Sequence, residues 1–275
     1  MKVEDCIVVV ERRTAGGCID LAFVFARQFA APLLKLTAWF AVPSVLLSWL
    51  VADSRGRDVL LPSLVIFGLF CMLASAAIVT AIGPQVFGVP VTTKAALRLL
   101  FSRLPAYVMA GTLARTTGLC LMVPLLFVMA WCGHLPEVLF LERTPLNEVS
   151  RRLSTLCRHG GYARNLNRLL TLTVFWAVFS FGVFLILDLS SGTLFQRPIF
   201  FGTIAPGPDM RSAFASQLVD DAVVVTALQV SLWLTFPVMR LAWFFCYLDQ
   251  RIRNECWDLE LQFRIEAVRL EEQLT

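Results

Sequence analysis

Acidic and basic side chains gather in one stretch near the end of the chain. Residues 247–264 read YLDQRIRNECWDLELQFR and directly follow the apolar run SLWLTFPVMRLAWFFC. Carboxylates in such a group can transfer protons, and arginines can stabilise negative charge that develops in a reaction. The stretch therefore has two interpretations: a catalytic group, or the point where the chain leaves a membrane. The first five of its seven charged residues are Asp249, Arg251, Arg253, Glu255 and Asp258.

The spacing of these charges favours a helix that leaves a membrane. Asp249 and Arg253 are four residues apart, as are Arg251 and Glu255. Pairs at this spacing stabilise a helix by about 0.2–0.5 kcal/mol each. An apolar face accompanies them, made of Ile252, Cys256, Leu259 and Phe263. We therefore interpret the charges as support for an emerging helix rather than as catalytic groups.

Histidine and cysteine offer little further chemistry. The chain has two histidines and eight cysteines, and the cysteines show no CxxC spacing, so neither disulfides nor a zinc site is predicted. His134 and Glu137 are three residues apart and would bind a metal only as an isolated pair, so a solvated pair at the membrane interface is favoured. His159 is expected to act as a cation at a helix C-terminus. With no glycine-rich phosphate loop or catalytic triad pattern, no catalytic, metal or cofactor site is predicted.

The composition indicates a membrane protein. Of the 275 residues, 57% are hydrophobic and 16% are charged, whereas an ordinary soluble domain is about 25% charged. The mean hydropathy is +0.71, and no polar stretch is long enough for a separate soluble catalytic domain. The net charge of +4 is interpreted as membrane topology, and no nucleic-acid binding is predicted.

Apolar segments of about 20 residues, the length that crosses a bilayer, recur along the chain. We therefore predict an all-α fold: an integral membrane helical bundle of about six transmembrane helices with amphipathic cytoplasmic surface helices. The predicted spans are 33–52, 59–82, 103–117, 119–141, 169–187 and 222–247. The predicted divisions are a cytoplasmic N-terminus with an interfacial helix (1–32), the six-span membrane domain (33–247) and a cytoplasmic C-terminal amphipathic helix (248–275).

The region 105–141 has two interpretations, a two-helix hairpin that turns near residues 116–118 or one long bent helix. The next segment, 142–168, contains six arginines. Cytoplasmic loops carry an excess of lysine and arginine. The hairpin is favoured because it places this segment and both termini in the cytoplasm.

Two segments before the C-terminal stretch are predicted to be surface helices. The first, Ile19–Ala31, is apolar almost all round. The second, Thr144–Arg158, begins with a capping threonine followed by proline. Its apolar residues fall on one face and its arginines off that face, which suits a leaflet rich in anionic lipid. The apolar residues are Leu146, Val149, Leu153 and Leu156.

Ten residues are predicted to have structural or interaction roles. Glu142, next to Arg143, is expected to pair with Arg251 or Arg253 and to clamp the cytoplasmic rim. Arg240 lies inside the last span and is expected to extend toward the cytoplasmic surface. The ten residues are Glu142, Arg143, Arg151, Arg152, Arg240, Asp249, Arg251, Arg253, Glu255 and Asp258.

Three blocks carry a resemblance to a known family. They are RTAGGCIDLAFVFARQFAAPLLKLTAWFAVP (13–43), TGLCLMVPLLFVMAWCGHLPEVLFLERTPLNEVSRRLSTL (117–156) and YLDQRIRNECWDLEL (247–261). With these blocks the chain resembles the bacterial polytopic family of the glycerophosphoryl diester phosphodiesterase membrane domain and its YciC-like relatives. The resemblance implies a six-helix bundle in the bacterial cytoplasmic (inner) membrane. Some relatives carry a fused phosphodiesterase domain, and this sequence has no counterpart of it.

The predicted function follows from two amphipathic helices beside an absence of catalytic patterns. We expect a non-enzymatic integral membrane protein that acts as an accessory, anchoring or scaffold subunit. Its cytoplasmic helices would bind membrane lipids or a cytoplasmic or membrane protein partner. The alternative is a transporter or lipid-handling protein, in which helices interrupted at Pro124 and Pro237 line a path.

Overall fold

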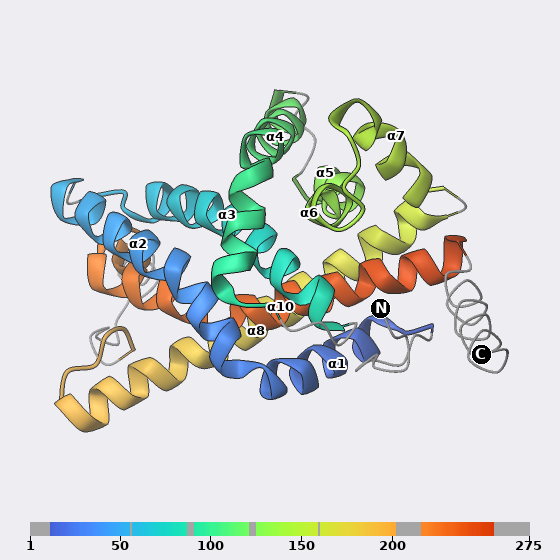
Figure 1. Cartoon of the computed structure of the whole chain (residues 1–275). Coiled ribbons are helices and arrows are strands. Elements are labelled where there is room, and N and C mark those ends of the chain that lie inside the picture. The colour runs from blue at the N-terminus through green and yellow to red at the C-terminus, as the bar shows by residue number, and fades with distance from the viewer. Residues whose placement is uncertain are drawn as a thin grey trace, which may run out of the picture. The chain divides into compact units, whose positions relative to one another are not determined.

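Every regular element in the described residues is a helix, which confirms the all-α prediction (Figure 1). The computed structural model describes residues 12–55, 57–86, 91–120, 125–158, 160–201 and 216–255. The helices are α1 (Ala15–Gln28), α2 (Ala30–Arg55), α3 (Leu60–Val86), α4 (Thr93–Cys120), α5 (Leu125–Cys132), α6 (Leu135–Phe140), α7 (Leu146–Leu156), α8 (Gly161–Phe195) and α10 (Ala222–Glu255). Residues beyond Glu255, including Asp258, lie outside the described part of the chain.

Four helices, α2, α3, α8 and α10, are long and apolar enough to cross a membrane. These helices contain the predicted spans 33–52, 169–187 and 222–247. They also contain the predicted span 59–82 apart from residue 59, because α3 begins at Leu60. Large apolar side chains remain exposed on α2, where Trp39 is 65% and Leu50 is 63% exposed. An exposed apolar surface of this kind is typical of helices that face lipid.

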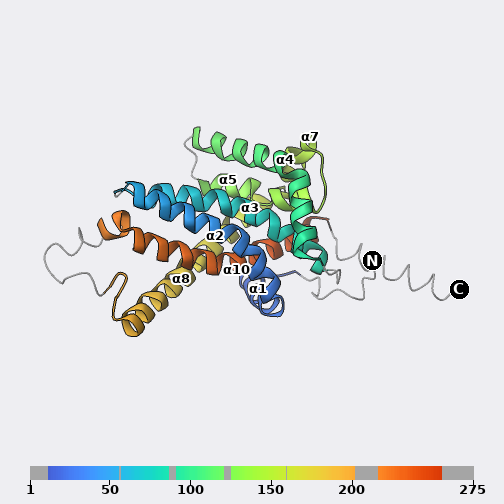
Figure 2. The ribbon, with the colours of Figure 1, turned by 60° about the vertical axis from the view of Figure 1, so that its left-hand side comes forward.

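The region 105–141 folds as more than one helix. α4 continues through residues 116–118 to Cys120, so the predicted turn at these residues is wrong. α4 packs against both α5 and α6, and the chain therefore reverses direction after α4. Figure 2 shows α4 beside α5.

The second arm of this region is itself interrupted at Gly133. A Cβ atom at Gly133 would lie 2.4 Å from the Met129 carbonyl oxygen and 2.8 Å from the Trp243 ring, so only glycine fits this close approach. The Trp243 indole N–H donates to the Gly133 carbonyl oxygen at 3.0 Å. Pro136 then occupies the first turn of α6, where its missing N–H costs nothing.

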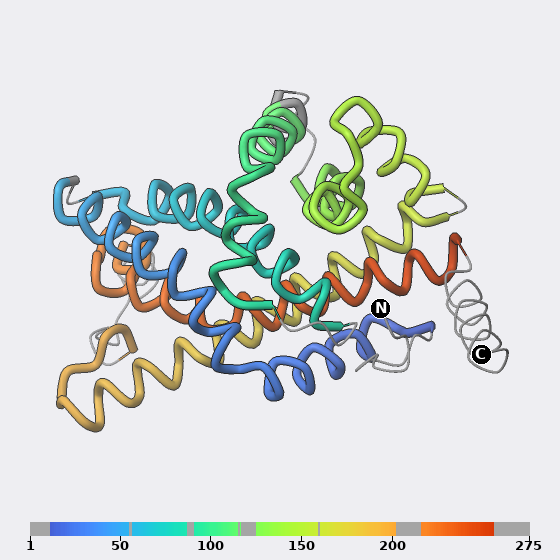
Figure 3. Tube along the Cα trace, viewed as in Figure 1, coloured from blue at the N-terminus to red at the C-terminus, as the bar shows by residue number. Residues whose placement is uncertain are grey.

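Contacts divide the chain into two compact units. Unit 1 contains the described residues within Met1–Phe29, Ser75–Leu172 and Val238–Thr275. Unit 2 contains those within Ala30–Ala74 and Thr173–Pro237. The path of the chain through α5, α6 and α7 of unit 1 can be followed in Figure 3.

In unit 2, polar side chains of the apolar helices pair with one another. The Gln229 amide donates to the Ser44 hydroxyl at 3.0 Å. Thr235 lies 2.6 Å from the Ser180 hydroxyl and accepts from the Trp176 indole N–H at 2.9 Å. Such pairs satisfy groups that lipid cannot hydrogen-bond.

Unit 1 is built around the C-terminal part of α10, where residues 240–250 are all buried. α1 starts at Ala15 rather than at Ile19, because the Thr14 hydroxyl caps it by accepting from the Gly17 N–H at 3.2 Å. One face of α1 is buried, and its Phe25 ring contacts the Phe245 ring edge-on. Only part of the surface of α1 is therefore exposed, although its sequence is apolar almost all round.

Candidate functional site

Unit 1 contains a cavity with a volume of about 730 Å³. A volume between about 300 and 1,000 Å³ is usual for small-molecule sites. Five of the ten sequence-predicted residues line this cavity, and we call it the arginine cavity. These five are Glu142, Arg143, Arg151, Arg152 and Arg251.

The lining of the arginine cavity contains both charged and apolar residues. Its charged residues are four arginines and two glutamates, so positive charge is in excess by two. The glutamates are Glu142 and Glu148. The apolar floor comprises Leu99, Phe140, Leu141, Phe244 and Leu248.

Helix α7 orients Arg151 and Arg152 because its opposite face is buried. Val149, Leu153 and Leu156 are each at most 5% exposed and lie on the side of α7 that packs against α5 and α6. Three of the four residues of the predicted apolar face therefore contact the protein rather than a lipid leaflet, whereas the fourth, Leu146, is 42% exposed. The predicted Thr144 cap is wrong, because Pro145 occupies the N-cap position and no side chain caps the helix.

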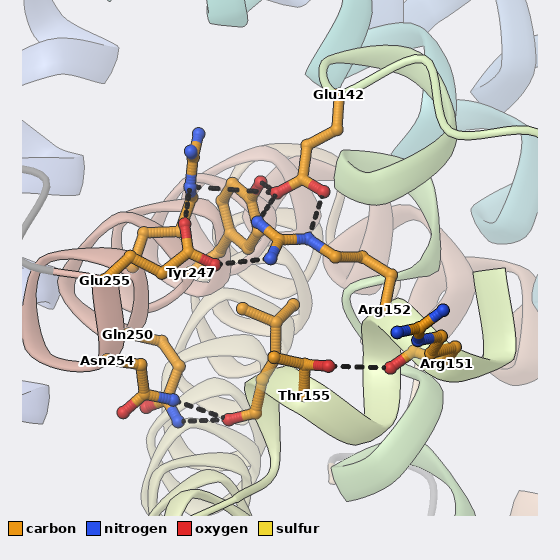
Figure 4. A network of polar contacts seen from close by, with 10 residues as sticks. Glu142, Arg151, Arg152, Thr155, Tyr247, Gln250, Asn254 and Glu255 are labelled. Carbon is orange, nitrogen blue, oxygen red and sulfur yellow. Dashed lines mark hydrogen bonds and ion pairs between the residues drawn. The ribbon is translucent and has the colours of Figure 1, made fainter. Parts of the chain in front are cut away.

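The carboxylate of Glu142 is held by side chains from two helices (Figure 4). Arg152 binds it in a bidentate manner, with Nε 2.5 Å from Oε2 and Nη2 2.7 Å from Oε1. The Tyr247 hydroxyl donates to Oε1 at 2.7 Å. Bidentate arginine–carboxylate pairs are among the strongest in proteins. The hydrogen bond to Glu142 raises the pKa of the Arg152 guanidinium above its ordinary value.

Glu255 completes this network from the end of α10. It lies 2.5 Å from Arg152 Nη1 and accepts from Arg251 Nε at 3.0 Å. Arg251 Nε also lies 3.7 Å from Glu142, which confirms one of the two pairings predicted for that glutamate. The other predicted partner, Arg253, binds Asp249 instead.

The last carbonyl group of α7 is held by two amides of α10. Gln250 and Asn254 both donate to the Leu156 carbonyl oxygen at 2.8 Å (Figure 4). A Cβ atom at Gly161 would lie 2.4 Å from this oxygen and 2.5 Å from the Gln250 amide nitrogen. Glycine at 161 therefore permits the close approach that fixes α7 against α10.

Asp249 lies outside the arginine cavity and joins three segments of unit 1. Only 1% of the residue is exposed. Its carboxylate accepts from the Arg13 backbone N–H at 2.6 Å and from Arg253 at 2.7 Å. It also forms an ion pair with the buried Arg168 of α8. In the sequence, the signal at Arg168 is confined to its place in a basic segment.

Arg240 is buried in an ion pair, so the prediction that it reaches the surface is wrong. Its Nη2 donates to Glu137 Oε1 at 2.6 Å, and the side chains of the two residues are 4% and 0% exposed. His134 is also buried, with its ring stacked on Trp243 at 4.4 Å. The predicted solvated pair of His134 and Glu137 is therefore wrong as well. Packing of α6 against α4 and α10 encloses these groups.

Two arginines at the mouth of the arginine cavity are exposed. Arg143 and Arg151 have no acidic partner within the part of the chain that the structure describes. Arg143 has a φ of +54°, a left-handed conformation that few residues other than glycine adopt without cost. The cavity thus offers two guanidinium groups above an apolar floor, an arrangement suited to an anionic ligand.

Comparisons with known proteins place no further constraint on this site. The resemblance to the glycerophosphoryl diester phosphodiesterase membrane domain stays a prediction. No protein-family model, curated protein or solved structure matches the chain.

Proposed function

We propose that the chain is a multi-pass protein of the bacterial inner membrane with about six spans and both termini in the cytoplasm. Four apolar helices support the membrane location. The reversal of the chain between α4 and α5 supports a fifth and a sixth span. Six arginines in 142–168 support a cytoplasmic position for α7.

The topology predicts which side of the membrane exposed residues face. Ser54 and Ser154 are both exposed, and each would be replaced by cysteine in a background without native cysteines. An impermeant thiol reagent added to intact cells should label the cysteine at 54 and not the one at 154. Labelling of position 154 from outside would exclude a cytoplasmic α7 and restore five spans.

For the function, we propose a non-enzymatic accessory or anchoring protein that holds an anionic group in the arginine cavity. The observation that carries this proposal is the pair of exposed arginines, Arg143 and Arg151, above an apolar floor. The carboxylates nearest to the cavity favour binding over acid–base chemistry. Glu142 lines the cavity and Glu255 is ion-paired beside it, and arginines bind the carboxylates of both residues.

The transporter alternative has less support from the contacts. Gln229 and Arg240 are the polar residues of α10 that would line a path through the membrane. Gln229 instead bonds to Ser44, and Arg240 is paired with Glu137. Both residues therefore have structural partners in their own units.

Photo-crosslinking in native membranes tests the proposed function. Benzoylphenylalanine at Thr155, which lines the cavity, should capture a lipid or a protein. The same residue at Ser154, which is exposed on α7 but does not line the cavity, is the matched control. The adduct at 155 should disappear when Arg143→Gly and Arg151→Ala are combined. Equal adducts at both positions, or an adduct that persists in the double variant, would refute binding in the cavity.

A further inference from the structure

We propose that the arginine cavity binds a phosphate-bearing membrane lipid, with the phosphate on Arg143 and Arg151 and the acyl chain against the apolar floor. This inference rests on the proposed anion-binding function and names its ligand class.

The charges of the cavity are divided between internal pairs and the mouth. Arg152 is held by Glu142 and Glu255, and Arg251 contacts the same two carboxylates. Arg143 and Arg151 are exposed at the mouth and have no such partner among the described residues. A phosphate group offers several acceptor oxygens, which match two guanidinium forks. Glu148 also lines the cavity and is exposed, so the exposed charged residues of the lining, Arg143, Arg151 and Glu148, carry one net positive charge.

The floor of the cavity indicates that the anion carries an apolar part. Leu248 is 8%, Phe140 is 4% and Phe244 is 1% exposed, so the floor is formed by core residues of unit 1. The close approach of Gly83 to Leu141, where a Cβ atom would lie 2.2 Å from Cδ2, brings α3 into the wall. A free inorganic anion would leave the half-buried Leu99 and Leu141 of the lining in contact with water. An amphiphile covers both the wall and the arginines.

The backbone at Arg143 supplies an independent observation. Its φ of +54° places it in the left-handed region, which is unfavourable for a residue other than glycine. Unfavourable backbone conformations that persist are often found at ligand sites. Glycine would adopt this conformation more easily than arginine. Its position at the cavity mouth assigns it to ligand binding.

A membrane lipid is the occupant that the rest of the chain favours. Four helices are long and apolar enough to cross a membrane, and in the proposed topology they place the protein in contact with lipid. Phosphate headgroups attract clustered arginines at the surface of a bilayer. A phospholipid combines this headgroup with an acyl chain in one molecule, as the charged and apolar residues of the lining require.

A thermal-shift titration of the full-length protein in a neutral detergent tests the inference. The probe is dioctanoyl phosphatidic acid, and dioctanoylglycerol and inorganic phosphate are the two partial probes. Phosphatidic acid should raise the melting temperature in a saturable manner, because a ligand that binds only the folded state stabilises it. Arg143→Gly and Arg151→Ala should each weaken the apparent Kd roughly tenfold or more.

Matched controls separate lost binding from lost folding. Gln196→Gly removes a left-handed non-glycine residue (φ +53°) in unit 2, and it should leave the titration unchanged. Arg158→Ala removes an exposed arginine after α7 that does not line the cavity, and it should also leave the titration unchanged. Without ligand, Arg143→Gly should melt no lower than the wild type, because glycine tolerates this φ.

Three other outcomes of the titration would each contradict a different part of the inference. An equal shift with inorganic phosphate would overturn the lipid and leave an anion site, so the proposed function would stand. An equal shift with dioctanoylglycerol would overturn the phosphate contact. No shift with any probe would overturn the inference, and the cross-link at position 155 would then show whether the proposed function fails with it.

Discussion

Arg240→Ala is expected to lower the free energy of unfolding by about 3–5 kcal/mol, because it leaves the buried carboxylate of Glu137 without its partner. Glu137 is completely buried and its Oε1 accepts from Arg240 at 2.6 Å. Water cannot replace the lost guanidinium at this depth. Denaturant or thermal unfolding of the purified protein in detergent measures the change.

A paired substitution distinguishes a buried pair from a general sensitivity of α10. Arg240→Met combined with Glu137→Leu should recover much of the loss, since well-packed apolar residues can replace a buried ion pair. Arg98→Ala, at an exposed arginine of α4, is the control and should change stability by less than about 0.5 kcal/mol. Wild-type stability of Arg240→Ala would instead mean that Arg240 reaches water and that the pair with Glu137 carries little energy.

Asp249→Asn is expected to destabilise the protein by about 3 kcal/mol or more. The substitution removes the charge that Arg168 and Arg253 share, and it leaves the buried Arg168 without its counterion. It also weakens the link to the Arg13 backbone N–H, so α1 should become more accessible to proteases. Unfolding and limited proteolysis in detergent measure the two effects.

A catalytic role of Asp249 leads to the opposite expectation. Asp249→Asn would then abolish function while the melting behaviour stayed that of the wild type. Asp20→Asn, at an exposed aspartate of α1, controls for the general loss of one negative charge in unit 1. A stable but inactive Asp249→Asn protein would contradict the structural role described here.

Local spacing in the sequence was sufficient for the helices and for their short-range pairs. Four predicted spans lie in α2, α3, α8 and α10. The pairs Asp249–Arg253 and Arg251–Glu255 are present at 2.7 and 3.0 Å. Residues four apart meet on any helix, so the spacing alone determines these contacts. The apolar face of α7 followed from spacing for the same reason.

Other features of the unit 1 core required knowledge of how the helices pack. Spacing identified the face of α7 but not what covers it, because lipid and protein accept the same apolar side chains. The 116–118 turn was predicted from small and polar residues, yet their backbone is helical to Cys120.

Only the tertiary structure determined the ion pairs between residues that are far apart in the sequence. Arg240 meets Glu137 across 103 positions, and Arg168 meets Asp249 across 81. A charge inside an apolar segment must either reach water or find a partner. The sequence shows that such a charge exists. Only the fold determines whether the charge reaches water or forms an ion pair, because the oppositely charged residue lies on another helix.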